Sequence, residues 1–243
     1  MFSIYKKEIN SFFSSLIGYI VAGVFLVFMG LLMWLFVDTS ILEDNYATID
    51  QLFSLAPMIF IFLVPAVTMK SFADEFKDGT YELLAVYPIQ EWKIVLAKFL
   101  ANGTLILIIL LPTLVYVYSV YQLGSPRGNL DLGAIAGSYF GLFLVALVFV
   151  SIGLFSSALT TNQIIAFALG SFLSFFLLWA FQFISTLPIF YGQFDDLVQK
   201  LGINYHYSSI SRGVIDSRDV IYFLSVIIFL LFSCMVVLEK RKG

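Results

Sequence analysis

The sequence predicts an all-α membrane protein with six transmembrane helices, and three observations lead to this fold class. Of the 243 residues, 60% are hydrophobic and only 12% are charged, whereas soluble domains carry about 25% charged residues. The mean hydropathy is +0.97. Five long intervals contain no charged residue, and each supplies at least the roughly 20 apolar residues that a helix needs to cross the hydrocarbon core.

The charge-free intervals also place the individual helices. They predict spans at about 15–37, 51–69, 98–121, 133–156, 163–185 and 218–238 in a single domain, 1–243. The interval 132–194 is too long for one span, and its polar middle at 156–163 indicates a turn between two helices. The runs are continuously apolar, which favours helices over barrel strands. The first run is too long for a signal-peptide core, so we expect a retained first helix.

The distribution of Lys and Arg predicts the orientation. With six spans both termini share a side, and that side carries nine Lys and Arg residues, Lys98 among them. The opposite side carries four. Because cytoplasmic loops are enriched in Lys and Arg, we expect both termini in the cytoplasm.

Composition and motifs exclude several functions. The net charge of −3 provides no cationic surface for nucleic acid. One cysteine, Cys234, and one histidine, His206, cannot build a disulfide or the usual metal clusters. The predicted spans lack the ionisable residues that mark ion-coupled carriers and intramembrane enzymes, and no G-x-x-x-x-G-K-[ST] motif is present. We therefore expect no catalytic residue, bound cofactor or metal in this chain.

Small residues spaced by four occur at the start of the fourth span, at Gly133, Gly137 and Gly141. Residues of this size at this spacing allow helices to approach closely. The pattern is compatible with packing inside the chain and with a subunit interface.

Two segments at the cytoplasmic boundary have amphipathic character. Residues 1–13, with Tyr5, Lys6 and Lys7, predict an interfacial helix whose lysines extend to the headgroups. In the loop 70–97, Gly79 is a helix-stopping residue and Thr80 can cap a new short helix. Pro88 ends that helix. This surface helix could rest on the headgroups or dock a cytoplasmic partner.

The longest loop on the opposite side is 186–218. Residues 195–202 predict a short amphipathic helix that stops at Gly202. His206 is expected to form hydrogen bonds within this loop. The loop itself could act as a lid over the bundle, as a gate or as a contact with a partner. Ion pairs are expected among the charged residues that follow, which are Arg212, Asp216, Arg218 and Asp219.

The cytoplasmic loop resembles a known family. The run from Phe72 to Pro88 is similar to the E-x-x-x-G-T-x-E-x-L-x-x-x-P signature of ABC-2-type transporter permeases. Residues 151–163 and 211–222 resemble two further segments of that family. The pair Phe76 and Lys77 departs from it, because many members carry a more basic pair there. Within the family, the chain is similar to gliding-motility-associated permease subunits.

The resemblance implies a six-helix half-transporter in the bacterial inner membrane. Two copies of a separate P-loop ATPase, which binds the ATP and Mg²⁺, would dock on the cytoplasmic side, and a second membrane subunit, different or identical, would complete the complex. ATP hydrolysis would drive transport or mechanical work in gliding motility. The implied docking residues of the coupling helix are Glu75, Gly79, Thr80, Glu82, Leu83 and Pro88. The alternative is a non-transporting scaffold of a cell-envelope machine.

Overall fold

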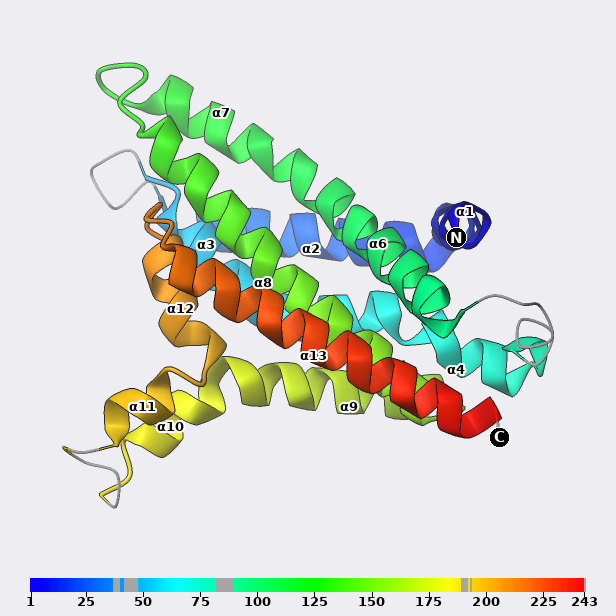
Figure 1. Ribbon diagram of the computed structural model, residues 1–243. Coiled ribbons are helices and arrows are strands. Elements are labelled where there is room, and N and C mark those ends of the chain that lie inside the picture. The colour runs from blue at the N-terminus through cyan, green and yellow to red at the C-terminus, as the bar shows by residue number, and fades with distance from the viewer. Residues whose placement is uncertain (37–39, 42–47, 82–89, 189–191, 193, 243) are drawn as a thin grey trace.

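Helices form the whole regular structure of the part of the chain that the computed structural model describes, which is residues 1–36, 40–41, 48–81, 90–188, 192 and 194–242. Within the described residues, five segments are long and apolar enough to cross a membrane, or six if the bent pair at the N-terminus is one span. The predicted all-helical membrane fold class is therefore confirmed (Figure 1).

The first half of the described chain is built from long helices that are broken at defined points. The helices are α1 (Phe2–Phe13), α2 (Leu16–Trp34), α3 (Asp50–Thr68), α4 (Lys70–Lys77), α6 (Glu91–Leu110), the 3-10 turn η2 (Leu111–Thr113) and α7 (Leu114–Leu123). The axes of α1 and α2 differ by 66°. Pro112 lies in η2, where a residue without an N–H interrupts the α-helical ladder.

The second half contains the most buried span and the two least buried ones. The helices are α8 (Leu132–Leu159), α9 (Gln163–Phe175), the π-helical turn η3 (Phe176–Ala180), α10 (Phe181–Ser185), α11 (Asp195–Gln199), α12 (Ile203–Ile210) and α13 (Ser217–Lys242). The apolar window of α8 is 78% buried, against 28% for the α9–α10 span and 22% for α13.

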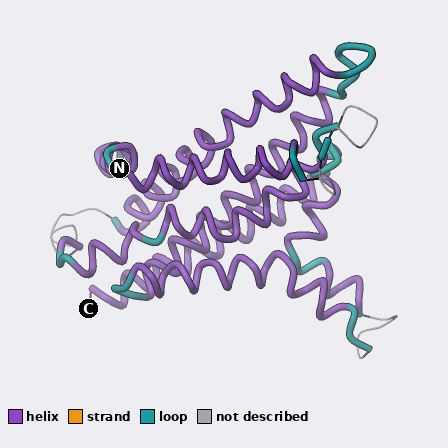
Figure 2. Tube along the Cα trace, turned by 180° about the vertical axis from the view of Figure 1, so that it is seen from behind, coloured by secondary structure: helices purple, strands orange, loops and turns teal. Residues whose placement is uncertain are grey.

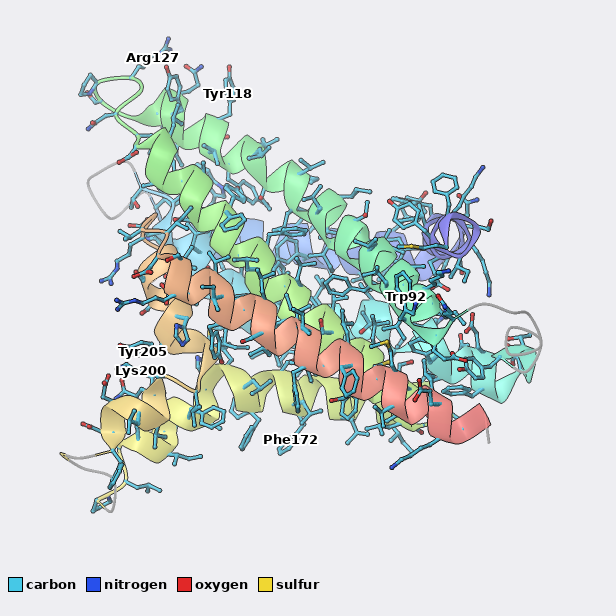
Figure 3. All side chains as sticks on the ribbon, viewed as in Figure 1. Trp92, Tyr118, Arg127, Phe172, Lys200 and Tyr205 are labelled. Atoms are coloured by element: carbon cyan, nitrogen blue, oxygen red, sulfur yellow. The ribbon has the colours of Figure 1, made fainter. Side chains whose placement is uncertain are left out.

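Helix α8 occupies the centre of the bundle and packs against α3, α6, α9 and α13. A helix that is apolar on all sides is expected to be buried in this way. Both chain ends and α4 lie at one end of the bundle, and the α7–α8 connection and α11 lie at the other (Figures 1 and 2). Exposed Trp92 and Tyr118 mark opposite ends of the α6–α7 span (Figure 3), as in an aromatic belt.

Glycines allow α8 to approach its neighbours. A Cβ on Gly141 would lie 2.3 Å from Ile210 Cγ2, and a Cβ on Gly137 would lie 2.9 Å from the carbonyl oxygen of Gly213. Both glycines thus contact the segment around α12. Gly133 differs, because its Cβ would approach only Asp131, the N-cap residue of the same helix, at 3.2 Å.

The segment between α10 and α13 differs from the expected loop. The expected short helix is present as α11, which ends at Gln199, and Gly202 is the N-cap residue of a further helix, α12, that was not expected. Asp219 pairs with His206, with 2.7 Å between Oδ1 and Nδ1. Among the described residues no ion pair joins the four charged residues that we expected to pair with one another. Asp219 pairs with His206 because α12 brings His206 to the start of α13.

The contact between Gly153 and Thr68 generates a prediction. A Cβ on Gly153 would lie 1.9 Å from Thr68 Oγ1 and 2.8 Å from Thr68 Cβ. Gly153→Ala should therefore lower the free energy of unfolding by about 1–3 kcal/mol, because the two helices must separate. Reversible unfolding in detergent measures the change.

The matched control is Gly23→Ala, because no atom lies within 4 Å of a Cβ built there. This control should unfold like the parent chain. Adding Thr68→Ala to Gly153→Ala should restore part of the loss. Equal stability of Gly153→Ala and Gly23→Ala would contradict the close approach of α3 and α8.

Candidate functional site

The most unusual side chain at the end of the bundle with both termini is Lys98, in α6. Its side chain is 0% exposed. The ammonium donates to Glu8 Oε1 at 2.7 Å, to Glu75 Oε1 at 3.0 Å and to the Ser71 carbonyl oxygen at 2.6 Å. Because burying a charge is costly unless it is paired and hydrogen-bonded, these three acceptors explain how the fold accommodates Lys98.

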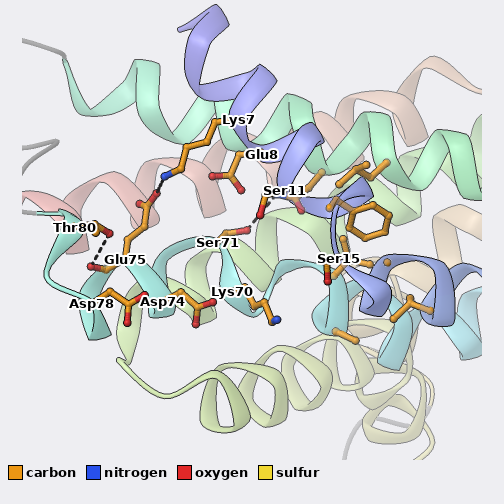
Figure 4. A pocket seen from close by; sticks show the side chains of 17 residues that line it. Lys7, Glu8, Ser11, Ser15, Lys70, Ser71, Asp74, Glu75, Asp78 and Thr80 are labelled. Carbon is orange, nitrogen blue, oxygen red and sulfur yellow. Dashed lines mark hydrogen bonds and ion pairs between the residues drawn. The ribbon is translucent and has the colours of Figure 1, made fainter.

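A second ammonium, that of Lys7, extends this arrangement. Lys7 Nζ lies 3.0 Å from the same oxygen, Glu75 Oε1 (Figure 4). Lys7 and Glu8 come from α1, Glu75 from α4 and Lys98 from α6, so four charges that balance one another join three helices. We refer to these four residues as the ion cluster. Glu75 Oε2 is buried and accepts no hydrogen bond from the described residues.

The local sequence explains why α4 ends just after Glu75. Gly79 follows the C-cap residue Asp78 with φ +68°, the left-handed conformation that ends many helices. No atom lies within 4 Å of a Cβ built on Gly79, so backbone conformation and not crowding favours glycine there. The Thr80 hydroxyl donates to the Glu75 carbonyl oxygen at 3.4 Å, so Thr80 closes α4 from its C-terminal side.

The remaining candidate residues of the surface helix, Glu82, Leu83 and Pro88, lie outside the described residues. The two ends of that segment are nevertheless joined. The Tyr81 hydroxyl donates to Glu91 Oε2 at 3.0 Å, and its ring packs edge-on against Phe76 at 4.9 Å between centroids. Burial, and then the Glu91 carboxylate, raise the pKa of Tyr81. The phenol therefore stays protonated and keeps donating at neutral pH.

The opposite side of α4 is tied to α8 and α9. Ser157 Oγ accepts hydrogen bonds from the backbone N–H groups of Phe72 and Ala73, both at 3.0 Å, and donates to the Met69 carbonyl oxygen at 2.9 Å. It thereby satisfies N–H groups that the first turn of a helix leaves unpaired. Gln163 Nε2 donates to Asp74 Oδ1.

The C-terminal helix also contacts α4. The Arg241 guanidinium lies over the Phe76 ring at 4.4 Å from its centroid and donates to the Leu159 carbonyl oxygen at 2.8 Å. Helix α4 thus has side-chain contacts with α1, α6, α9 and α13, and its backbone is bonded to α8.

The interfacial candidates on α1 have separate environments. The Tyr5 hydroxyl donates to Thr104 Oγ1 of α6 at 3.1 Å, Lys7 joins the ion cluster, and Lys6 is exposed. Helix α1 is therefore fixed to α6 by two polar contacts and presents Lys6 outward.

Sequence reasoning missed the residues that complete this site. Lys98 was counted as a surface cation, and no role was foreseen for Glu8, Ser157 or the side chain of Gln163. One signal was available, because Lys98 precedes a long apolar run and Asn102 follows one turn later on the same face. Asn102 Nδ2 in fact donates to Ser71 Oγ at 3.3 Å.

In the described part of the chain, no group of three or more His, Cys, Asp or Glu side chains could hold a metal ion. The ion cluster joins α1, α4 and α6 through charges. The ion cluster, together with the contacts of Ser157, Gln163 and Arg241, fixes the short helix α4 relative to α1, α6, α8, α9 and α13.

Comparisons with known proteins agree with this architecture. No curated protein matches the chain. A family described as ABC-2 family transporter protein matches residues 40–202, which is more than half of the 243 residues. The matched part includes α4, α6, α8 and α9, the helices that meet at the site. The chain therefore belongs to the ABC-2 family of transporter proteins.

Proposed function

We propose that this chain is the membrane-spanning permease subunit of an ABC transporter complex, and that it couples ATP hydrolysis by a separate ATPase subunit to transport or mechanical work. Membership of the ABC-2 family supports the permease role. The observation that carries the coupling role is the ion cluster, which joins α1, α4 and α6. In the sequence, α4 comes shortly before the segment 82–89.

A docking element must transmit displacement to the spans, and the contacts of α4 support this role. Tyr81 and Glu91 hold the two ends of the segment together. A force on this segment reaches α4 through Gly79 and Thr80, and α4 forms one continuous candidate span with α3, Asp50–Lys77. Ser157 and Gln163 pass the displacement to α8 and α9.

The excess of Lys and Arg at this end of the bundle supports a cytoplasmic position for both termini and for α4. We infer that the chain lies in the bacterial inner membrane with this orientation. Two copies of a P-loop ATPase would bind ATP and Mg²⁺, and the chain itself would contribute no catalytic residue, cofactor or metal ligand. The docking surface is formed by Glu82, Leu83 and Pro88 together with α1.

A second membrane subunit, identical or different, completes the proposed complex. The α9–α10 span and α13 expose most of their apolar surface, and Phe172 of α9 is 62% exposed (Figure 3). Such faces are available to lipid or to another subunit. The similarity to the gliding-motility-associated permease subunit GldF supports a role in gliding motility.

Replacing Lys98 tests the structural part of the proposal. Lys98→Met removes the partner of Glu8, and breaking a buried pair costs about 3–5 kcal/mol, because the remaining charge is uncompensated. Unfolding in detergent should show this loss. The double variant Lys98→Met with Glu8→Gln should regain part of it.

Lys200→Met is the control for this experiment, because its ion pair with Asp196 is exposed and lies at the other end of the bundle. It should unfold like the parent chain. Parental stability of Lys98→Met would show that the ion cluster does not hold the three helices together.

Coupling is tested by Glu75→Gln and Glu82→Ala. The permease should copurify with a P-loop ATPase, and the rate of ATP hydrolysis is measured with the complex in lipid nanodiscs. We expect both variants to assemble with the ATPase. The permease should then stimulate the rate of ATP hydrolysis several-fold less than the parent does, because the docking segment no longer moves with α4. Asp196→Asn should behave like the parent. Full stimulation in both variants would show that the docking assignment is wrong. A parent chain that gives no stimulation would contradict coupling and favour a scaffold.

A further inference from the structure

Two hollows meet beside the α1–α2 connection. One is a cavity of about 390 Å³ lined by residues of α1, α2, α3, α4 and α6. The other is a groove of about 630 Å³ between α2 and α3, with Phe167 of α9 at its wall, and all of its lining residues are apolar. Val21 and Ala66 line both hollows. The cavity at the end of the bundle, which has polar and apolar walls, therefore adjoins an apolar groove along two spans.

The charged residues of the cavity are ordered along its length. Asp78, Asp74 and Lys70 follow one another along α4, and Ser15 of the α1–α2 connection lies beyond Lys70 (Figure 4). Their spacing of four places them on one face of the helix. From the acidic end toward the groove, the order is thus two carboxylates, one ammonium and then apolar side chains.

Among the described residues, one buried acceptor of the cavity has no hydrogen-bond partner, and one half-buried lysine has no ion-pair partner. Glu75 Oε2 is buried without a hydrogen-bond partner among the described residues, and the Glu75 side chain is only 9% exposed. An unpartnered buried acceptor of this kind is costly. Lys70 forms no ion pair with any residue that the structure describes. The nearby carboxylate of Asp74 accepts a hydrogen bond from Gln163 instead.

We propose that these hollows bind one phospholipid whose headgroup carries a primary amine. The order of groups in such a lipid, which is amine, phosphate, glycerol and acyl chain, matches the order of carboxylates, Lys70 and apolar groove. The ammonium donates to the carboxylates of Asp78 and Glu75, the phosphate pairs with Lys70, and an acyl chain lies between α2 and α3. The site shares Glu75 and Thr80 with the proposed docking residues. Lipid binding needs only the membrane fold, so it can be measured without an ATPase.

The charge balance selects this headgroup over others. The cavity is lined by four carboxylates, those of Glu8, Asp74, Glu75 and Asp78, and by two ammonium groups, those of Lys7 and Lys70. The buried Lys98 also pairs with Glu8 and Glu75, so four carboxylates face three ammonium groups. A net acidic lining disfavours an anionic lipid, which would need a basic site. A choline headgroup has no N–H to donate, so it cannot satisfy Glu75 Oε2.

The test uses the full chain, delipidated in detergent. It is titrated with phosphatidylethanolamine, phosphatidylcholine or phosphatidylglycerol of identical acyl chains, and native mass spectrometry measures the bound lipid. We expect one equivalent of phosphatidylethanolamine to bind at least fivefold more tightly than the other two. Asp78→Asn and Lys70→Gln should each remove this preference, and the distant control Asp196→Asn should retain it.

A second variant probes the place where the hollows meet. Ala66→Trp should fill the junction and lower the affinity for all three lipids at least fivefold, and if it does not fold, the Asp78→Asn result decides. Equal affinities for the three lipids, or a preference for phosphatidylglycerol, would overturn the proposal. So would a dimer of the parent chain that excludes lipid and dissociates in Ala66→Trp, because a second copy would then cover the groove. None of these outcomes bears on coupling to the ATPase.

Discussion

The buried ammonium of Lys98 is the constraint on which the end of the bundle with both termini depends. A charge without solvent contact is tolerated only when oxygen atoms surround it, and here they come from α1 and α4, which are distant in sequence. Once Lys98 is placed, Glu8 fixes the register of α1 and Glu75 fixes that of α4. The 66° bend between α1 and α2 is compatible with this arrangement, because α1 must turn out of the bundle to bring Glu8 to α6.

The ion cluster does not explain the stability of the bundle as a whole, which depends on apolar packing around α8. Buried ion pairs contribute little net stability compared with well-packed apolar residues, and their best-attested effect is to specify one arrangement. Helix α1 needs such specification. It lies outside the central packing, and apolar contact alone would let it slide along α6. Two directional contacts, Glu8 with Lys98 and Tyr5 with Thr104, remove that freedom.

Hydropathy predicted the spans well because the signal is long and local: the expected span 163–185 coincides with the helical segment Gln163–Ser185. The helix end at Gly79 could be predicted for the same reason, because it depends on a single residue. The ion cluster could not be predicted, because its contacts join residues 23 to 90 positions apart in the sequence. Lys98 was even counted among nine surface cations, although removing it leaves eight against four and the predicted orientation unchanged. The helix α12 was missed because it is short and polar-aromatic, although its buried residues Ile203, Tyr207 and Ile210 recur at helical spacing.

Glu75 links the two proposals physically. Its Oε1 receives both lysines of the ion cluster, while its Oε2 has no partner among the described residues and its side chain lines the cavity. A lipid amine that pairs with Oε2 and an ATPase that displaces α4 therefore act on one carboxylate. If lipid occupancy alters the position of α4, linkage requires that displacement of α4 alter lipid affinity by the same factor. Under the two proposals together, the lipid composition around this end of the bundle would act on the same helix that is proposed to receive the force from an ATPase.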